Sequence, residues 1–142
     1  MDVTDTDVAR IPVGNIRVPR DEFAAVWAHA ERRCHQQGDR GITDWYAAGV
    51  AVTCRWLAGA VAESYDGRRR LPPAPVSQRS SHAYEELIEA EHLAAERLEM
   101  RRPRLAWLAS RPGWSEAVRT TLRWAWRHEG PQPFETAMRS TG

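Results

Sequence analysis

The chain has 142 residues, a formal net charge of +1 and 42% hydrophobic residues, including seven tryptophans. This length is typical of one domain, and the hydrophobic content is sufficient for a core. A net charge near zero neither favours nor excludes a nucleic-acid partner, and Cys34 and Cys54 lack the spacing of a disulfide framework or a zinc site.

Residues 1–10 are acidic and polar, which predicts a disordered arm. They also lack the apolar run of a signal peptide, so we expect a cytoplasmic protein with reduced thiols. From Val13 to Val18 apolar and polar residues alternate, and this period of two predicts a short strand. Pro19 then begins a helix, which Gly38 ends.

The stretch 43–63 predicts the central helix of the fold. Trp45, Trp56 and other large apolar residues lie on every side of a helical wheel, and small residues between them would let neighbouring backbones approach closely. A helix that is apolar all round is buried on all sides. The alternative is a membrane span, but Arg55 near the middle would cost about 2.5–3.5 kcal/mol on insertion scales. We therefore expect no membrane association.

Two further helices are predicted beyond an Arg- and Pro-rich linker at residues 67–79. One begins near Ser80 or Ser81 and ends near Met100, and the other covers residues 114–128. A short helical turn around residues 105–108 separates them. Residues 80–130 would thus form a helical pair and residues 131–142 a tail. The expected fold class is mainly α, a four-helix arrangement around the buried central helix, with one short N-terminal strand that could pair in a dimer.

The order of the predicted N-terminal elements is similar to that of a known protein family. In residues 15–22, NIRVPRDE, an alternating strand runs into a helix begun by proline, and residues 42–44 open a second helix. This order, over residues 11–63, resembles the ribbon-helix-helix family of the Arc and MetJ type. The resemblance implies that region 11–66 forms a homodimer whose paired strands enter the major groove of DNA. It also implies that Asn15 and Arg17 read base edges and that the backbone amide of Thr43 holds a phosphate. The alternative is that residues 13–18 pack as an extended arm on a helical bundle.

A stripe of arginines marks the last predicted helix. Arg119, Arg123 and Arg127 recur at i, i+4 and i+8, beside Trp126. These side chains could dock an acidic protein partner or follow phosphates. The alternative is that they face Glu85, Glu89 and Glu96 of the preceding helix, within a helical hairpin.

Neither of two candidate chemical motifs is complete. Glu89 and His92 have the Glu-x-x-His spacing of di-iron bundles, but the sequence has no second copy. Cys34 precedes His35, yet no third group that could orient them is visible. We therefore expect neither a metal nor a cofactor, and no enzymatic activity.

The sequence predicts a small non-catalytic regulator of the antitoxin or repressor kind. Its N-terminal half would bind DNA through Asn15, Arg17 and Thr43. Its C-terminal helices would bind a protein partner through four side chains, Arg119, Arg123, Trp126 and Arg127. The alternative function is an all-helical interaction adaptor or assembly subunit that binds no DNA.

Overall fold

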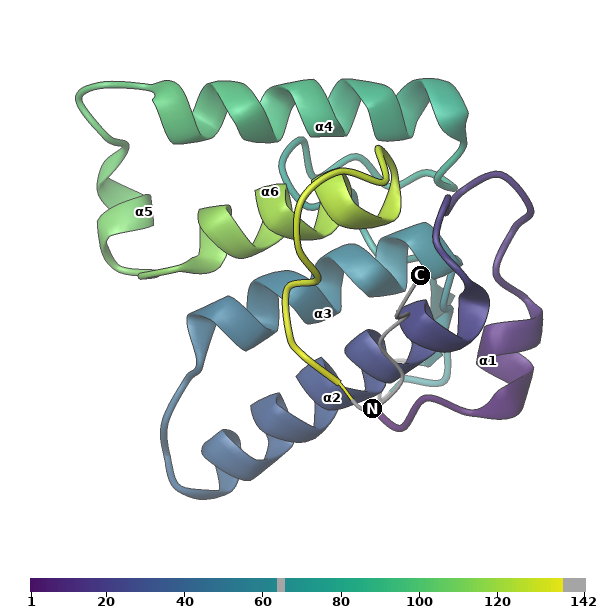
Figure 1. The fold of residues 1–142 in the computed structure, drawn as a ribbon. Helices are drawn as coiled ribbons and strands as arrows, with labels where there is room; N and C mark the ends of the chain where they lie inside the picture. Colours follow the sequence, from purple (N-terminus) through teal and green to yellow (C-terminus); the bar gives the residue numbers. More distant parts are fainter. Residues whose placement is uncertain (64–65, 137–142) are drawn as a thin grey trace.

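A largely buried helix, α3 (Trp45–Ala58), lies at the centre of the fold, which a computed structural model describes for residues 1–63 and 66–136. In these residues the other elements are α1 (Asp5–Ala9), α2 (Arg20–Asp39), β1 (Ala62–Glu63), β2 (Arg69–Arg70), α4 (Glu85–Met100), α5 (Ala106–Ala109) and α6 (Trp114–Ala125). The four long helices stack in the order α4, α6, α3 and α2, so that α3 packs between α2 and α6 (Figure 1). The prediction of a mainly α fold is confirmed, whereas α3 is not buried on all sides, because Trp45, Ala48 and Val52 are only half-buried.

Local sequence explains both ends of α3. The Asp44 side chain caps its first turn by accepting a hydrogen bond from the Ala47 N–H at 3.0 Å. Gly59 ends it with a left-handed φ of +64°, five residues before the predicted end. Gly49 allows α6 to approach closely, because a Cβ there would lie 2.7 Å from the carbonyl oxygen of Trp114. The small residues of α3 therefore act at this position as the sequence predicted.

The acidic N-terminus forms helix α1, where we predicted disorder. The Thr4 hydroxyl accepts a hydrogen bond from the Asp7 N–H at 3.2 Å, and the Asp7 carboxylate accepts one from the Thr4 N–H at 2.9 Å. This reciprocal capping box satisfies two backbone donors of the first turn. The Arg20 guanidinium also donates to the carbonyl oxygen of Val8 at 2.9 Å. The acidic residues therefore start a helix that is anchored to α2.

The predicted strand at residues 13–18 is wrong, because this segment forms turns and bends. Val13 is 93% exposed, whereas Asn15, in the same register of the predicted alternation, is 3% exposed. The backbone N–H of Arg17 donates to the carbonyl oxygen of Ala125 at 2.7 Å, at the end of α6. This tertiary bond holds the segment against a helix of its own chain. Packing on the helices is what our alternative expected, although the arm is not extended.

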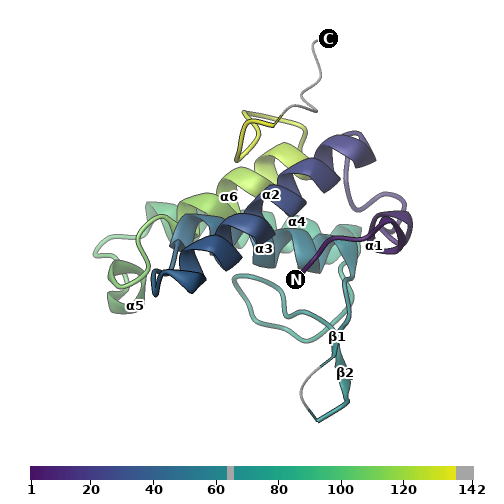
Figure 2. The same ribbon diagram turned by 90° about the horizontal axis from the view of Figure 1, so that it is seen from below.

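Only the later part of the predicted linker at residues 67–79 packs against the helices, whereas residues 67–70 are exposed. The linker contains β2, which pairs with β1 in an antiparallel hairpin with Ala62 opposite Arg70. The following 71–81 loop lies along one side of the stack, next to the projecting hairpin (Figure 2). Glu91 of α4 fixes this loop, because its carboxylate accepts hydrogen bonds from the backbone N–H groups of Val76 at 2.9 Å and Ser77 at 3.1 Å.

Helix α4 begins at Glu85, four to five residues after the predicted N-cap. Residues 80–83 are held out of the helix by bonds to distant groups. The Trp56 indole N–H donates to the carbonyl oxygen of Ser81 at 3.3 Å, and the Asn15 amide donates to that of Ala83 at 3.0 Å. Tertiary hydrogen bonds here replace the serine cap that the sequence offered.

The predicted tail divides into two parts. Residues 131–136 return to the helices, where the Phe134 ring lies between Tyr46 and His29, at centroid distances of 5.4 and 4.6 Å. Residues 137–142 lie outside the described part of the chain. Within the residues that are described, none of the helices is both long and apolar enough to cross a bilayer.

Candidate functional site

The arginine stripe of α6 faces α4. Arg119 forms an ion pair with Glu96 at 2.8 Å, Arg123 approaches the same carboxylate at 3.7 Å, and Arg127 pairs with Glu89. The helical hairpin that we gave as the alternative is therefore formed, and these arginines hold two helices of one chain together. Such partly exposed pairs contribute at most about 1 kcal/mol each.

Trp126 belongs to the same internal contact. It is 5% exposed, and its indole N–H donates to the Glu89 carboxylate at 2.7 Å. This hydrogen bond, helped by the charge of Arg127, holds the pKa of the Glu89 carboxyl below its usual value. The Arg17 guanidinium lies 4.1 Å from the centre of the Trp126 ring. The indole that we predicted to bind a partner is thus covered by groups of its own chain.

The predicted DNA-binding residues lie apart from one another. The Asn15 amide is buried and donates to the carbonyl oxygens of Leu57 at 2.9 Å and Ala83 at 3.0 Å, so it faces the interior at the C-terminal end of α3. Thr43 is exposed just before the N-terminus of α3. These ends are separated by roughly 20 Å at 1.5 Å per helical residue. Asn15, Arg17 and Thr43 therefore form no common surface that could read one DNA site.

A carboxylate of the chain already lies at the helix N-terminus where we predicted that Thr43 would hold a phosphate. The Asp44 carboxylate caps α3 and accepts a hydrogen bond from the Arg33 guanidinium at 2.6 Å. The backbone N–H of Ile42 donates to the carbonyl oxygen of Gln37 at 2.9 Å and is not available to a ligand. The positive end of the helix dipole is thus already matched by a carboxylate.

A cavity of about 500 Å³ lies beside α3. Its walls are the 71–81 loop and the start of α6, and most lining side chains are apolar. We call it the Trp/Pro groove, since it is lined by Trp45, Ala48, Val52, Ala60, Leu71, Pro72, Pro73, Pro75 and Trp114, with the polar residues Arg55, Arg70, Gln78 and Arg111. A volume of this size is typical of sites for ligands and peptide side chains.

Three arginines line the Trp/Pro groove, and two of them give it its positive charge. Arg55 is neutralised by the buried carboxylate of Glu31, to which its Nε donates at 2.7 Å. Arg111 stacks between Trp45 and Trp107, at 5.2 and 5.4 Å from the two rings. In the described part of the chain neither Arg70 nor Arg111 has an ion-pair partner, and no carboxylate lines the groove. The groove is therefore apolar with an excess of positive charge.

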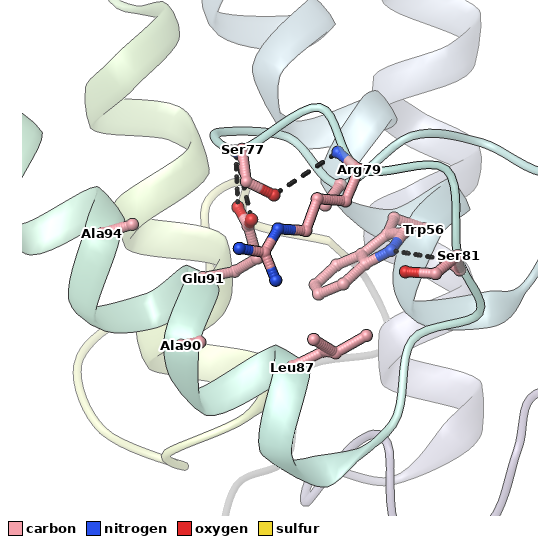
Figure 3. A pocket seen from close by; sticks show the side chains of 9 residues that line it. Trp56, Ser77, Arg79, Ser81, Leu87, Ala90, Glu91 and Ala94 are labelled. Atoms are coloured by element: carbon pink, nitrogen blue, oxygen red, sulfur yellow. Dashed lines mark hydrogen bonds between the residues drawn. The ribbon is translucent and has the colours of Figure 1, made fainter.

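A second, smaller cavity lies on the other side of the 71–81 loop, against α4 (Figure 3). Its volume is about 180 Å³, and Trp56, Leu87, Ala90 and Ala94 form its apolar part. Glu91 and Arg79 bring two opposite charges to it. The 71–81 loop thus forms one wall of both cavities.

The candidate catalytic and metal motifs show no activated group. Among the described residues no three His, Cys, Asp or Glu side chains gather in a way that could hold a metal ion. Burial raises the pKa of the Cys34 and Cys54 thiols, which disfavours the nucleophilic thiolate. His35 is exposed and lies 3.5 Å from Asp39 rather than against Cys34 as an orienting base.

The Trp/Pro groove was not predicted from the sequence, because Trp45, which does pack against the core, also lines the groove together with distant residues. Trp45 was counted as core and Pro72 and Pro73 as linker, whereas the fold brings them together. A signal was present in Trp107 and Arg111, which are spaced by four residues next to Pro112. Comparisons with models of protein families, with curated proteins and with solved structures found no match to this chain.

Proposed function

We propose that this chain is a non-catalytic protein-interaction module, as the alternative sequence prediction has it, and that its ligand is an acidic segment of a partner protein. An aromatic or aliphatic side chain of that segment would enter the Trp/Pro groove, and flanking carboxylates would meet Arg70 and Arg111. The observation that carries the proposal is the groove itself, apolar inside and bordered by arginines that have no carboxylate partner in the described residues.

The chemistry of the lining supports a peptide ligand. Tryptophan and arginine are enriched among the side chains that contribute most to protein interfaces. Arg111 is already positioned by Trp45 and Trp107, so less side-chain entropy is lost when it binds a carboxylate. The rigid prolines of the 71–81 loop preorganise the opposite wall in the same way. Burial of one apolar side chain would contribute about 1.5–3 kcal/mol, and a charge-assisted hydrogen bond a similar amount.

The partner site that we propose is the Trp/Pro groove and not the arginines of α6. Arg119, Arg123 and Arg127 would have to break their bonds to Glu89 and Glu96 before they could meet another protein. The Trp/Pro groove requires no such exchange.

DNA binding and the homodimer that the ribbon-helix-helix resemblance implied stay predictions. Salt-dependent binding to duplex DNA would test the first, and light scattering would test the second.

Selection from a random library of displayed peptides tests the proposed function directly. We expect enrichment of peptides with an aromatic or large aliphatic residue flanked by Asp or Glu. Synthetic copies should bind the wild-type chain, and binding should be lost with Arg111→Glu and with Val52→Asp. The matched control is Arg97→Glu, which reverses an exposed charge on α4 away from the groove. Peptides that bind Arg111→Glu as well as the wild type, or a selection that enriches basic peptides, would contradict the proposal.

A further inference from the structure

The smaller cavity has the features of a separate ligand site. It lies between the 71–81 loop and the first three turns of α4, and the Trp56 ring and Leu87 lie side by side at one end of it (Figure 3). Its volume of about 180 Å³ is below the 300–1,000 Å³ typical of sites for drug-sized ligands. Any small molecule that fills it must therefore have the size of a metabolite such as an amino acid.

The buried end of this cavity carries a negative charge. Glu91 is only 4% exposed, and its carboxylate is held by the backbone N–H groups of Val76 and Ser77. No cation pairs with it among the residues that the structure describes. Buried carboxylates are normally paired with a cation, since hydrogen bonds alone replace only part of the lost hydration. Each carboxylate can accept about four hydrogen bonds, so Glu91 retains capacity for a further donor.

The mouth of the cavity carries a positive charge. The Arg79 side chain extends from the loop over the cavity, and its guanidinium group lies on the same side as the Glu91 carboxylate (Figure 3). Its backbone N–H donates to the Ser77 hydroxyl at 3.4 Å, but its side chain forms no hydrogen bond or ion pair within residues 1–63 and 66–136. Two opposite charges thus border one small cavity without pairing with each other.

We propose that this cavity binds a free α-amino acid with an apolar side chain. The ammonium group would donate to Glu91, the carboxylate would accept from Arg79, and the side chain would lie against Trp56, Leu87 and Ala90. A simple anion would be repelled by the buried carboxylate, and a simple cation by the guanidinium. A zwitterion satisfies both, with charge-assisted hydrogen bonds at each end.

Isothermal titration calorimetry with L-leucine tests the site on the full chain. Two analogues separate the charges: isopentylamine lacks the carboxylate, and N-acetyl-leucine lacks the ammonium group. We expect L-leucine to bind at least about tenfold more tightly than either analogue. Arg79→Gln should weaken the binding of L-leucine about tenfold, whereas isopentylamine, which is repelled by the guanidinium, should bind the variant at least as tightly as the wild type. Arg97→Gln, on the same helix as Glu91 but outside the cavity, should bind like the wild type.

Three results would overturn the inference. The first is the absence of binding heat for L-leucine at any soluble concentration. The second is equal affinity for leucine and both analogues, because apolar contact alone would then explain binding. The third is a loss of chain stability in Arg79→Gln without any leucine binding, which would mean that Arg79 simply pairs with Glu91. Because the cavity and the Trp/Pro groove have separate charged residues, failure here leaves the proposed peptide site untouched.

Discussion

The close approach of α3 and α6 makes Gly49→Ala the sharpest test of the packing. A Cβ added at Gly49 would lie 2.7 Å from the carbonyl oxygen of Trp114 and 2.8 Å from the Cβ of Ala117. Both distances are shorter than real Cβ contacts allow, and the first involves backbone, which cannot rotate away. The two helices would therefore have to separate by several tenths of an ångström.

Two opposing effects determine the sign of this substitution. Alanine is favoured over glycine inside a helix by about 1 kcal/mol. Overpacking of a tight core costs about 1–3 kcal/mol. Because the clash involves the central helix pair, we expect the second effect to dominate. The net loss should be about 1–2 kcal/mol of the free energy of unfolding, which lowers the urea midpoint by roughly 0.5–1 M.

Urea titration followed by far-ultraviolet circular dichroism measures this change. Gly38→Ala is the matched control, because Gly38 lies in α2 and a Cβ there would meet nothing within 4 Å. That variant should be more stable than the wild type by about 0.5–1 kcal/mol, through helix propensity alone. A Gly49→Ala variant as stable as Gly38→Ala would refute the close contact between α3 and α6.

Three further predictions follow from buried polar groups. Asn15→Ala removes both hydrogen bonds to buried carbonyl oxygens and should cost about 1–3 kcal/mol in the same urea titration, whereas a midpoint equal to that of the wild type would mean that Asn15 faces solvent. Burial holds the pKa of His92 below its usual 6.5, so the unfolded chain binds a proton that the folded chain does not, and stability should fall as the pH drops through 6.5. His92→Gln should reduce that slope below about pH 6.5, and an unchanged slope would exclude His92 as its source. Cys54 is buried with a raised pKa, so Cys34→Ser should leave no thiol that reacts with Ellman's reagent before unfolding, and rapid colour development would contradict this burial.

The positions of the long helices could be predicted from the sequence because their signals are local. Pro19 before α2, Gly113 before α6 and the apolar periodicity of each helix act within a few residues. The end of α3 at Gly59 and the start of α4 at Glu85 were not predicted. The pairing of the α6 arginines with α4 was also accessible as an alternative, since blocks of opposite charge follow each other in the chain. Helix identity and this charge pairing therefore needed no tertiary information.

The candidate sites could not be predicted in this way. The Trp/Pro groove combines residues from three separate regions of the chain, around Trp45, Pro72 and Arg111. The smaller cavity depends on Glu91, a residue to which the sequence analysis assigned no role. No pattern around Glu91 indicates that it would be buried by backbone amides from residues 76 and 77.

The sequence by itself determined the mainly α class and the largely buried central helix, because an all-round apolar helix has no stable place except among its neighbours. Only the tertiary structure decided what the polar residues between the helices do. Asn15 alternates like the outward residue of a strand, yet its amide is bound by carbonyl groups 42 and 68 residues away. The periodicity of a sequence indicates only its local secondary structure. The hydrogen-bond partner of a buried polar group depends instead on which distant segments pack together. The candidate sites of this chain therefore depend on contacts between segments that are distant in the sequence.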